Sequence, residues 1–359
     1  MRYILSGGGT GGHIYPALAI GEEIKKQDET AKILYVGKKG SLEEELATKY
    51  GFEFQGIDIS GLPRKKLNKE TIVTMFDLFK GLNQAGKILK KFKPNIVIGT
   101  GGYVCAPIVY KAQQYNIKTV VQEQNAYPGK TNRILARKAD LVFINFKEAE
   151  EYLNNKNIIY VGNPIRDDFT HIDREKSRRK LGISESEKFV FSFGGSGGQE
   201  STNDAMIEIL NKYDELPFKL VHVTGREHYD YFMEKVEKLP KGVEVFDYTH
   251  HVSDYLSSAD LVIASSSAMT LAEISAVGLC TILIPKAYTA GNHQYYNAMS
   301  YYNMGASEVI EEKDLDGEIL YSHINDLLED DDRRNTMAKN SKKLASPGAV
   351  SEIVDIMTK

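Results

Sequence analysis

The chain has 359 residues and a mass of 40.2 kDa, which is long enough for two domains of ordinary size. Hydrophobic residues make up 42% of it and charged residues 26%, the proportions of a soluble globular protein. The formal net charge of −4 gives no overall attraction to nucleic acid, so any anionic ligand must be recognised by a local site.

The two cysteines, Cys105 and Cys280, are far apart and outside any zinc-binding spacing. A disulfide framework and a zinc site are therefore not expected, and we expect no cofactor and no metal. The chain does not open with a signal-peptide pattern, and no segment has the roughly 18 apolar residues of a membrane span. These features predict a cytoplasmic protein.

The opening stretch predicts a ligand loop. Residues 2–6 resemble a buried strand, the glycine-rich segment 7–13 follows, and residues 14–24 have helical spacing. Glycines allow backbone N–H groups at a helix start to approach an anion, so the loop is a candidate phosphate or diphosphate seat. It matches neither the dinucleotide fingerprint nor a P-loop. A tight turn without a ligand is the alternative.

The first half continues as alternating strands and helices. Strands are predicted at 32–36, 96–99, 119–122, 141–145 and 158–161, and helices at 42–50, 106–115 and 130–136. This alternation predicts parallel βαβ units with right-handed crossovers, whose ligands bind beyond the carboxyl ends of the strands. The segments 100–103 and 123–129 follow two of these strands. Taken singly, each could also be a purely structural turn.

A basic and apolar segment lies at 62–93. Its helical part contains Phe76 and Phe79, Arg64-Lys65-Lys66 precede it, and further lysines follow up to Lys93. Such a segment can lie on an anionic membrane surface, with apolar side chains in the interface and cations on the headgroups. The alternative is an ordinary helix that packs on its own sheet and exposes a charged face.

The second half repeats the opening pattern. After a charged stretch at 170–188, which we expect to be the linker, a strand at 189–193 enters the glycine-rich segment 194–199, and a helix follows from about residue 201. Further strands are predicted at 219–223, 243–246, 261–264 and 281–284, and a last helix at 349–357. The expected fold is α/β, with two doubly wound Rossmann-like domains facing each other across a cleft. The expected domains are 1–163 and 164–348, with helix 349–359 packing back on the first.

Glu273 has two interpretations. Thr270 is a plausible N-cap, and Glu273 stands three residues later as in a capping box. In the functional interpretation the carboxylate accepts the hydroxyls of a ribose. The later segment 291–298 gathers several side chains that can form hydrogen bonds.

Seven motifs in order carry a family resemblance over nearly the whole chain. They are Gly8-Gly9-Thr10-Gly11-Gly12-His13, Gly101-Gly102-Tyr103-Val104, Gln122-Glu123-Gln124-Asn125-Ala126, Gly162-Asn163-Pro164-Ile165-Arg166, Gly194-Gly195-Ser196, Ala268-Met269-Thr270-Leu271-Ala272-Glu273 and His293-Gln294. The chain resembles the GT-B glycosyltransferases that transfer N-acetylglucosamine from its UDP form to lipid-linked N-acetylmuramoyl-pentapeptide in bacterial cell-wall synthesis.

The resemblance implies a role for each motif. His13 would assist the acceptor hydroxyl, Glu273 would bind the ribose, and the segment 64–93 would face the anionic membrane at the cytoplasmic side. Residues implied at the acceptor are Gly101, Gly102 and Tyr103. Residues implied at the UDP-sugar donor are Thr10, Gly11, Gly12, Asn125, Arg166, Ser196, Thr249, Ala268, Met269, Thr270, Leu271, Ala272, Glu273 and Gln294.

The chain departs from the family pattern at two places, both on the donor side. Ser265-Ser266-Ser267 stands where the family usually has an arginine and a glycine before Ala268, and Gly197-Gly198-Gln199 replaces the usual Gln-Gly-Ala. A serine hydroxyl can still donate to a phosphate or to uracil. The resemblance implies an inverting transfer to a C4 hydroxyl. A glycolipid transferase, a UDP-sugar epimerase and a non-catalytic UDP-sugar-binding protein are the alternatives.

Overall fold

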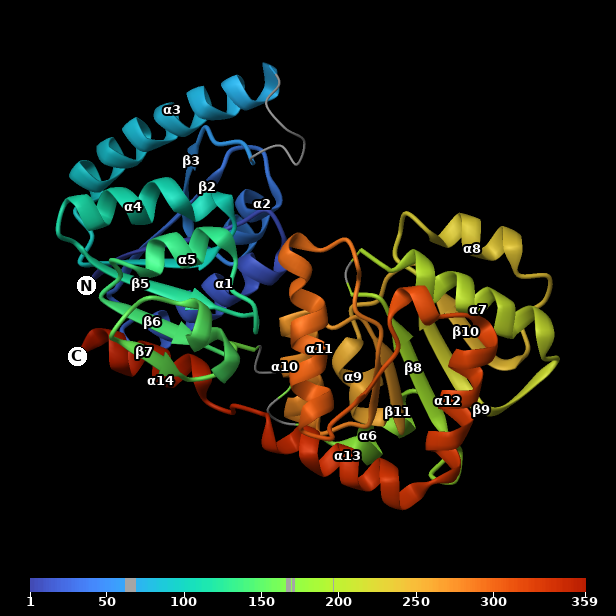
Figure 1. Cartoon of the computed structure of the whole chain (residues 1–359). Coiled ribbons are helices and arrows are strands. Elements are labelled where there is room, and N and C mark those ends of the chain that lie inside the picture. The colour runs from blue at the N-terminus through green and yellow to red at the C-terminus, as the bar shows by residue number, and fades with distance from the viewer. Residues whose placement is uncertain (62–68, 166–168, 170–171, 196) are drawn as a thin grey trace. The chain divides into compact units, whose positions relative to one another are not determined.

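The computed structural model describes residues 1–61, 69–165, 169, 172–195 and 197–359. The chain divides into two compact units (Figure 1). Unit 1 comprises residues 1–165 and 348–359, and unit 2 comprises residues 166–347. Each unit is a parallel sheet between helices, so the expected class of two Rossmann-like α/β domains is confirmed.

Unit 1 contains a seven-stranded parallel sheet in the order β3-β2-β1-β4-β5-β6-β7. Alternate residues of the buried strands point to opposite faces, and both faces are covered because a parallel sheet packs helices on each side. The strands are β1 (Arg2–Gly7), β2 (Lys32–Lys38), β3 (Glu53–Ile57), β4 (Ile96–Gly101), β5 (Lys118–Glu123), β6 (Leu141–Ile144) and β7 (Ile158–Tyr160).

Two apolar clusters lie on the two faces of this sheet. On one face Leu5 of β1 packs with α1 (Gly11–Gln27), α2 (Leu42–Lys49) and the C-terminal α14 (Ala349–Thr358). On the other face Ile4 of β1 packs with α3 (Lys69–Phe92), α4 (Ala106–Gln114) and α5 (Lys130–Ala136). The described part of unit 1 also contains the 3-10 helices η1 (Tyr103–Cys105) and η2 (Lys147–Tyr152).

Unit 2 contains a six-stranded parallel sheet in the order β10-β9-β8-β11-β12-β13. Its strands are β8 (Phe189–Phe193), β9 (Glu215–Val223), β10 (Lys241–Phe246), β11 (Leu261–Ala264), β12 (Thr281–Leu283) and β13 (Glu308–Val309). Its helices are α6 (Arg174–Lys180), α7 (Glu200–Lys212), α8 (Tyr229–Lys235), α9 (Val252–Ser258), α10 (Ala268–Val277), η4 (Ala290–Asn292), α11 (His293–Asn303), η5 (Glu312–Asp314), α12 (Gly317–Glu329) and α13 (Asp331–Lys343).

The packing of unit 2 follows the same plan. Helices α7, α8 and α12 enclose an apolar cluster on one face of the sheet. On the other face Phe191 of β8 stacks on Tyr255 of α9 with ring centroids 5.0 Å apart. The carboxyl ends of β8, β11 and β12 meet at one edge, where the loops that begin at Gly194, Ser265 and Ile284 lie together.

The predicted linker is wrong. Within the charged stretch 170–188 the structure forms α6, whose Arg178 is 4% exposed and donates to the carbonyl groups of Ser184 and Ser258 at 2.6 and 2.8 Å. Arg178 therefore fixes α6 to the rest of unit 2 through these hydrogen bonds. The high charge content of the segment does not indicate a solvent-exposed linker. The last helix, α14, packs on α1 within unit 1.

Candidate functional site

The loop after β1 turns sharply into α1. Gly9 has a φ of 85°, in the left-handed region that favours glycine. The N–H of His13 bonds the Thr10 carbonyl at 3.1 Å, so the helix begins directly behind the loop. The first turn of α1 carries no acidic side chain. The N–H groups at this helix start and the positive end of the helix dipole are therefore available to an anion.

A second loop supports the first. A Cβ atom on Gly102 would lie 2.1 Å from the Gly8 carbonyl oxygen, so only glycine fits where the loops after β1 and β4 meet. The Thr100 hydroxyl donates to the His13 carbonyl at 2.6 Å. Thr10 Oγ1 lies 3.1 Å from His13 Nδ1, and the ring of His13 lies over Gly101. The structure thus brings the predicted Thr10, His13, Gly101 and Gly102 together.

Asn125 is held by a buried carboxylate at the end of β5. Glu123 Oε1 accepts from the backbone N–H and the side-chain amide of Asn125 at 2.9 and 3.0 Å. Glu123 Oε2 accepts from the N–H of Gly129 and from Asn132 Nδ2 at 3.0 and 2.8 Å. With four donors the carboxylate is well satisfied although it is 1% exposed. The sequence analysis selected Asn125 as a site residue but did not predict this role of Glu123. The only sequence feature that could have indicated it is an acidic residue between two glutamines and before an asparagine.

In unit 2 the serine run ties loops together. Ser265 Oγ donates to the Gly194 carbonyl at 3.2 Å, and Ser266 Oγ donates to the Gln294 carbonyl at 2.8 Å. The loops after β8, β11 and β12 are therefore joined at one edge. The expectation that these hydroxyls donate to a phosphate or to uracil has no support for Ser265 and Ser266, whose protons are used within the protein.

The start of α10 corrects the capping prediction. The N-cap is Ser267, which accepts from the Thr270 N–H at 3.4 Å, and not Thr270 itself. Glu273 is therefore in the second turn, too far along the helix to complete a capping box. Its side chain is half-buried.

Burial divides the predicted donor segment into two groups. The side chains of Ala268, Thr270 and Leu271 are buried, so they can offer a ligand little beyond their backbone. Met269, Ala272 and Glu273 are half-buried and lie on the more accessible side of the helix. A helix start of this kind can bind an anion through its backbone N–H groups and the positive end of its dipole.

A carboxylate of η5 connects two of these loops. Glu312 accepts from Gln199 Nε2 and Ser201 Oγ beside the glycine loop, at 2.9 and 2.6 Å, and from the N–H of Ala287 at 2.8 Å. Lys286 Nζ donates to the Gly198 carbonyl at 2.5 Å. Burial of its ammonium lowers the pKa of Lys286. No sequence pattern pointed to Glu312, because it lies on a short helix remote from every motif.

Gln294 and Thr249 complete the described donor-side residues. Gln294 is 6% exposed, and its Oε1 accepts from the N–H of Lys286 at 3.1 Å. Thr249 Oγ1 accepts from the N–H of His251 at 3.0 Å in the loop before α9. Arg166 and Ser196 lie outside the described residues. In the described ranges no group of three or more His, Cys, Asp or Glu side chains could hold a metal ion.

Comparison with known families decides the relationship. The model of the glycosyltransferase family 28 N-terminal domain matches residues 3–144, and the model of its C-terminal domain matches residues 189–353. The chain belongs to glycosyltransferase family 28. In this transferase the Thr10–His13 loop, the Gly101–Tyr103 loop and Asn125 fall in the N-terminal match. Thr249, the start of α10 and Gln294 fall in the C-terminal match.

Curated relatives match the transferase from end to end. One from Finegoldia magna is 45% identical over 359 residues, covering 99% of this chain and 97% of its own length. One from Caldanaerobacter subterraneus is 43% identical, covering 99% of each. Both carry the name UDP-N-acetylglucosamine--N-acetylmuramyl-(pentapeptide) pyrophosphoryl-undecaprenol N-acetylglucosamine transferase.

Solved structures agree on the fold. Acinetobacter baumannii MurG, 22% identical to the transferase, superposes with a TM-score of 0.81 and covers 99% of each chain. A UDP-GlcNAc 2-epimerase from Neisseria meningitidis, 12% identical, superposes with a TM-score of 0.68 over the full length of both. At these identities the superpositions establish the shared architecture alone.

Proposed function

We propose that this transferase moves N-acetylglucosamine from UDP-N-acetylglucosamine to the lipid-linked N-acetylmuramoyl-pentapeptide of peptidoglycan synthesis. One observation carries the proposal. Relatives that are 41–45% identical, and that are matched over 97–99% of their own length, share the name of that enzyme. The glycosyltransferase assignment of both domain models agrees with it.

The proposed reaction is an inverting displacement. The C4 hydroxyl oxygen of the muramoyl sugar forms a bond to the anomeric carbon of N-acetylglucosamine. The bond from that carbon to the diphosphate oxygen breaks, and UDP leaves with the electron pair. The hydroxyl proton passes to a base, for which we propose His13. Its half-buried ring is oriented through Nδ1 by Thr10 and sits against the glycine loop after β4.

The leaving diphosphate needs stabilisation as its charge develops. Preorganised N–H groups supply this more effectively than water, and the start of α10 presents them beside the glycine loop of unit 2. Arg166, Ser196 and Gln294 are proposed as further donor contacts. Glu273, which does not cap its helix, is proposed to accept the ribose hydroxyls.

Product analysis tests the function. The purified chain is incubated with radiolabelled UDP-N-acetylglucosamine and a lipid-linked muramoyl-pentapeptide, then with diacylglycerol, then without an acceptor. We expect a labelled disaccharide lipid and UDP only with the first acceptor. Label on diacylglycerol would indicate a glycolipid transferase, and an epimerised donor would indicate an epimerase. Donor binding without UDP release under all three conditions would indicate a non-catalytic protein.

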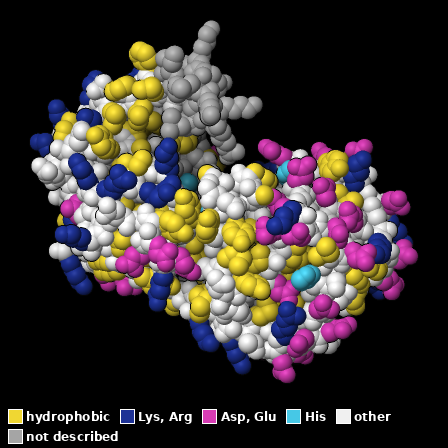
Figure 2. All heavy atoms as spheres, in the orientation of Figure 1, with side chains coloured by type: hydrophobic (Ala, Val, Ile, Leu, Met, Phe, Trp, Pro, Cys, Tyr) yellow, Lys and Arg dark blue, Asp and Glu magenta, His cyan; other side chains and the backbone are white. Residues whose placement is uncertain are grey.

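We further propose that α3 attaches the transferase to an anionic membrane surface at the cytoplasmic side. Met75, Phe76 and Phe79 are 53%, 75% and 61% exposed. Figure 2 shows hydrophobic side chains gathered with lysines and arginines over the part of unit 1 that contains α3. Within the described ranges no helix is long and apolar enough to cross a membrane. The expected basic residues Arg64, Lys65 and Lys66 lie outside the described residues.

A further inference from the structure

Lys286 holds a positive charge at the carboxyl edge of the sheet in unit 2. It follows β12, and it is the only lysine or arginine in the loops after β8, β11 and β12, which comprise residues 194–199, 265–267 and 284–292. The residue is half-buried. Among the described residues its ammonium makes one hydrogen bond, to the Gly198 carbonyl, and no ion pair. Two of its three donors are therefore uncommitted.

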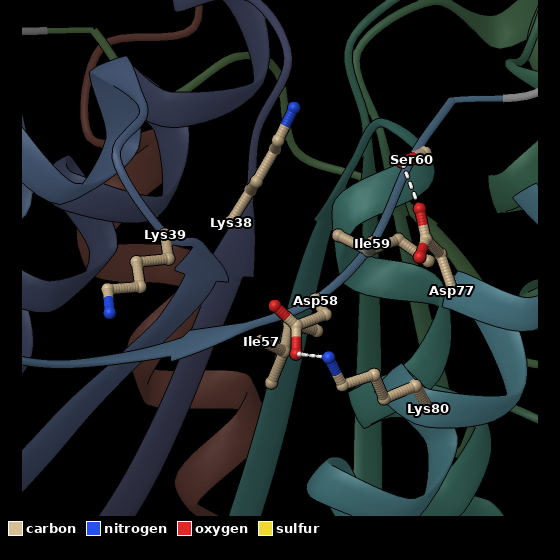
Figure 3. A pocket seen from close by; sticks show the side chains of 8 residues that line it. All are labelled: Lys38, Lys39, Ile57, Asp58, Ile59, Ser60, Asp77 and Lys80. Carbon is tan, nitrogen blue, oxygen red and sulfur yellow. Dashed lines mark hydrogen bonds and ion pairs between the residues drawn. The ribbon is translucent and has the colours of Figure 1, made fainter. Parts of the chain in front are cut away.

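A lysine of unit 1 shows the contrasting case of a paired ammonium. Lys80 of α3 lines a small cavity beyond the ends of β2 and β3, where its Nζ pairs with Asp58 at 2.8 Å (Figure 3). The hydrogen bond to Asp58 raises the pKa of Lys80. The pKa of Lys286 is lowered instead, because burial disfavours its charged form more than the nearby Glu312 favours it. Lys286 thus lacks the close counter-charge that Lys80 has.

Glu312 does not serve as that counter-charge, because other groups already occupy its carboxylate. It accepts from Gln199 Nε2, from Ser201 Oγ and from the N–H of Ala287. Removing an ammonium from water is costly unless an opposite charge or several hydrogen bonds replace the water. One backbone carbonyl replaces only part of it. An anionic ligand is therefore the partner that this position lacks.

The strand order places Lys286 where a ligand of such a sheet binds. From β8 the chain continues to β9 on one side, and from β11 it continues to β12 on the other side (Figure 1). With right-handed crossovers, α7 and α10 then lie on opposite faces, and the switch point of the sheet is between β8 and β11. The bond from Lys286 to Gly198 joins the loops of β12 and β8, the two strands that flank β11. The ammonium therefore lies beside the switch point.

The other polar groups of these loops supply no positive charge. The hydroxyls of Ser265 and Ser266 donate to backbone carbonyls. Gln199 Nε2 donates to the Ile284 carbonyl at 3.1 Å and to Glu312 at 2.9 Å. The start of α10 offers backbone N–H groups and the end of a helix dipole, which is equivalent to about half a charge. Within the three loops, a full positive charge comes from Lys286 alone.

We infer that the ammonium of Lys286 binds the diphosphate of the sugar donor. The inference rests on the proposed function, in which UDP-N-acetylglucosamine is the donor. The uracil, the ribose and the sugar of that donor are neutral, so its diphosphate is the group that matches an unpaired cation. Lys286 keeps its bond to Gly198 and gives its remaining donors to phosphate oxygens. Because negative charge builds on the diphosphate as UDP leaves, the same contact stabilises the transition state more than the bound donor.

The test compares UDP with uridine in calorimetric titrations of the full chain. Lys286→Met removes the charge and the hydrogen bond, whereas Lys286→Gln keeps an N–H donor for Gly198. We expect each variant to weaken UDP binding by roughly ten- to hundredfold, as for hydrogen bonds to charged groups. Uridine binding should be unchanged, because uridine has no diphosphate. Lys286→Arg keeps the charge and should retain most of the UDP affinity. Lys313→Met, at an exposed lysine of η5 that pairs with Glu311, is the matched control.

Three results would contradict the contact. If Lys286→Gln binds UDP as the parent does, Lys286 only ties the loops together. Equal losses for UDP and uridine would show that the variants disturb the whole site. An equal loss of UDP affinity in Lys313→Met would indicate a long-range effect of charge. Activity separates this inference from the proposed function. A parent chain that binds UDP but transfers no sugar refutes the transfer, while a selective loss of UDP binding in the Lys286 variants still supports the contact.

Discussion

His13 and His222 show how the surroundings of one residue type decide its chemistry. The ring of His13 is half-buried at the glycine loops and is oriented through Nδ1 by the Thr10 hydroxyl. His222 is fully buried in β9, where its two ring nitrogens bond Ser192 Oγ at 2.9 Å and Asn203 Oδ1 at 3.0 Å. The first arrangement suits a proton acceptor at a ligand site, and the second suits a permanently neutral structural group.

Replacing His13 tests the proposed base. Glutamine at position 13 can still form hydrogen bonds but cannot take a proton at neutral pH. We expect His13→Gln to lower kcat by roughly 10²- to 10⁴-fold, with little change in UDP binding measured by calorimetry. His228→Gln, a histidine just before α8, is the control. Near-full turnover with an unchanged pH profile would remove His13 from the role of base.

Protonation of His222 should make the stability of unit 2 depend on pH. Burial lowers the pKa of His222 from 6.5 to about 3. Above pH 6.5 both the folded and the unfolded state hold it neutral. As the pH falls from 6.5 towards 3, only the unfolded state gains the proton, so the free energy of unfolding falls by about 1.4 kcal/mol per pH unit.

The measurement compares slopes rather than absolute stabilities. Denaturant unfolding of the parent chain and of His222→Gln is followed between pH 7 and pH 4.5. Carboxylates contribute equally to both proteins. We therefore expect the free energy of unfolding to fall with decreasing pH more steeply for the parent chain, by the contribution of one extra proton bound in the unfolded state. Parallel curves would show that His222 is protonated in the folded state or accessible to solvent.

The glycine loop of unit 2 depends on support from other elements. Glu312 of η5 accepts hydrogen bonds from Gln199, at the end of the loop after β8, and from Ala287, in the loop after β12. Lys286 donates a further hydrogen bond to the Gly198 carbonyl. Hydrogen bonds to charged groups contribute about 1.5–3 kcal/mol. If part of this energy keeps the loops ready for the donor, we expect Glu312→Ala to weaken UDP binding by roughly tenfold.

Glu312 is predicted to act by position and not by contact with the donor. The change should therefore appear in KM for UDP-N-acetylglucosamine, with kcat at saturation within about twofold of the parent. Glu312→Gln keeps one acceptor oxygen and should recover part of the affinity. Glu311→Gln is the matched control, because its carboxylate pairs only with the exposed Lys313 at 3.3 Å among the described residues. An equal loss of UDP affinity in Glu312→Ala and in Glu311→Gln would contradict the proposed supporting role of Glu312.

Strong periodic elements could be predicted from the sequence, and weak ones could not. The strands 189–193 and 261–264 and the helix 130–136 have the predicted bounds. β3 was missed because Glu53, Gln55 and Gly56 leave only two apolar residues in the segment, and β13 because it is two residues long. Both lie at sheet edges, where the neighbouring strand supplies the pairing that a short or polar segment does not encode.

The site was predicted as motifs but not as a network. Glycine loops at strand ends are visible in the sequence because their spacing follows from the βα unit. The buried carboxylates near them have no such signal: Glu43 lies beneath Gly8 and accepts from the Lys38 N–H, and Glu123 accepts from Asn125. Their role depends on which distant backbone groups the fold brings within hydrogen-bond reach. The same reason explains why the cap of α10 was assigned to Thr270 instead of Ser267.

Charge is divided unevenly between the two units. Unit 1 holds 25 Lys and Arg against 18 Asp and Glu, a formal charge of +7, whereas unit 2 holds 20 against 31, a charge of −11. The net charge of −4 hides this difference. Near an anionic surface unit 1 is attracted and unit 2 is repelled, which favours approach with α3 towards the lipid.

Vesicle binding should therefore require both charge and apolar surface. We expect Lys87→Glu/Lys90→Glu to weaken binding to vesicles containing phosphatidylglycerol by at least tenfold at low salt, because each basic residue near the surface contributes about 1 kcal/mol. The difference should shrink as salt screens the charges. Phe76→Ser/Phe79→Ser should weaken binding in a salt-independent way, because it removes apolar area. Tyr231→Ser, at an exposed aromatic residue of unit 2, is the control. Unchanged binding in both double variants would leave α3 as an ordinary surface helix and would require another part of the chain to reach the lipid-linked acceptor.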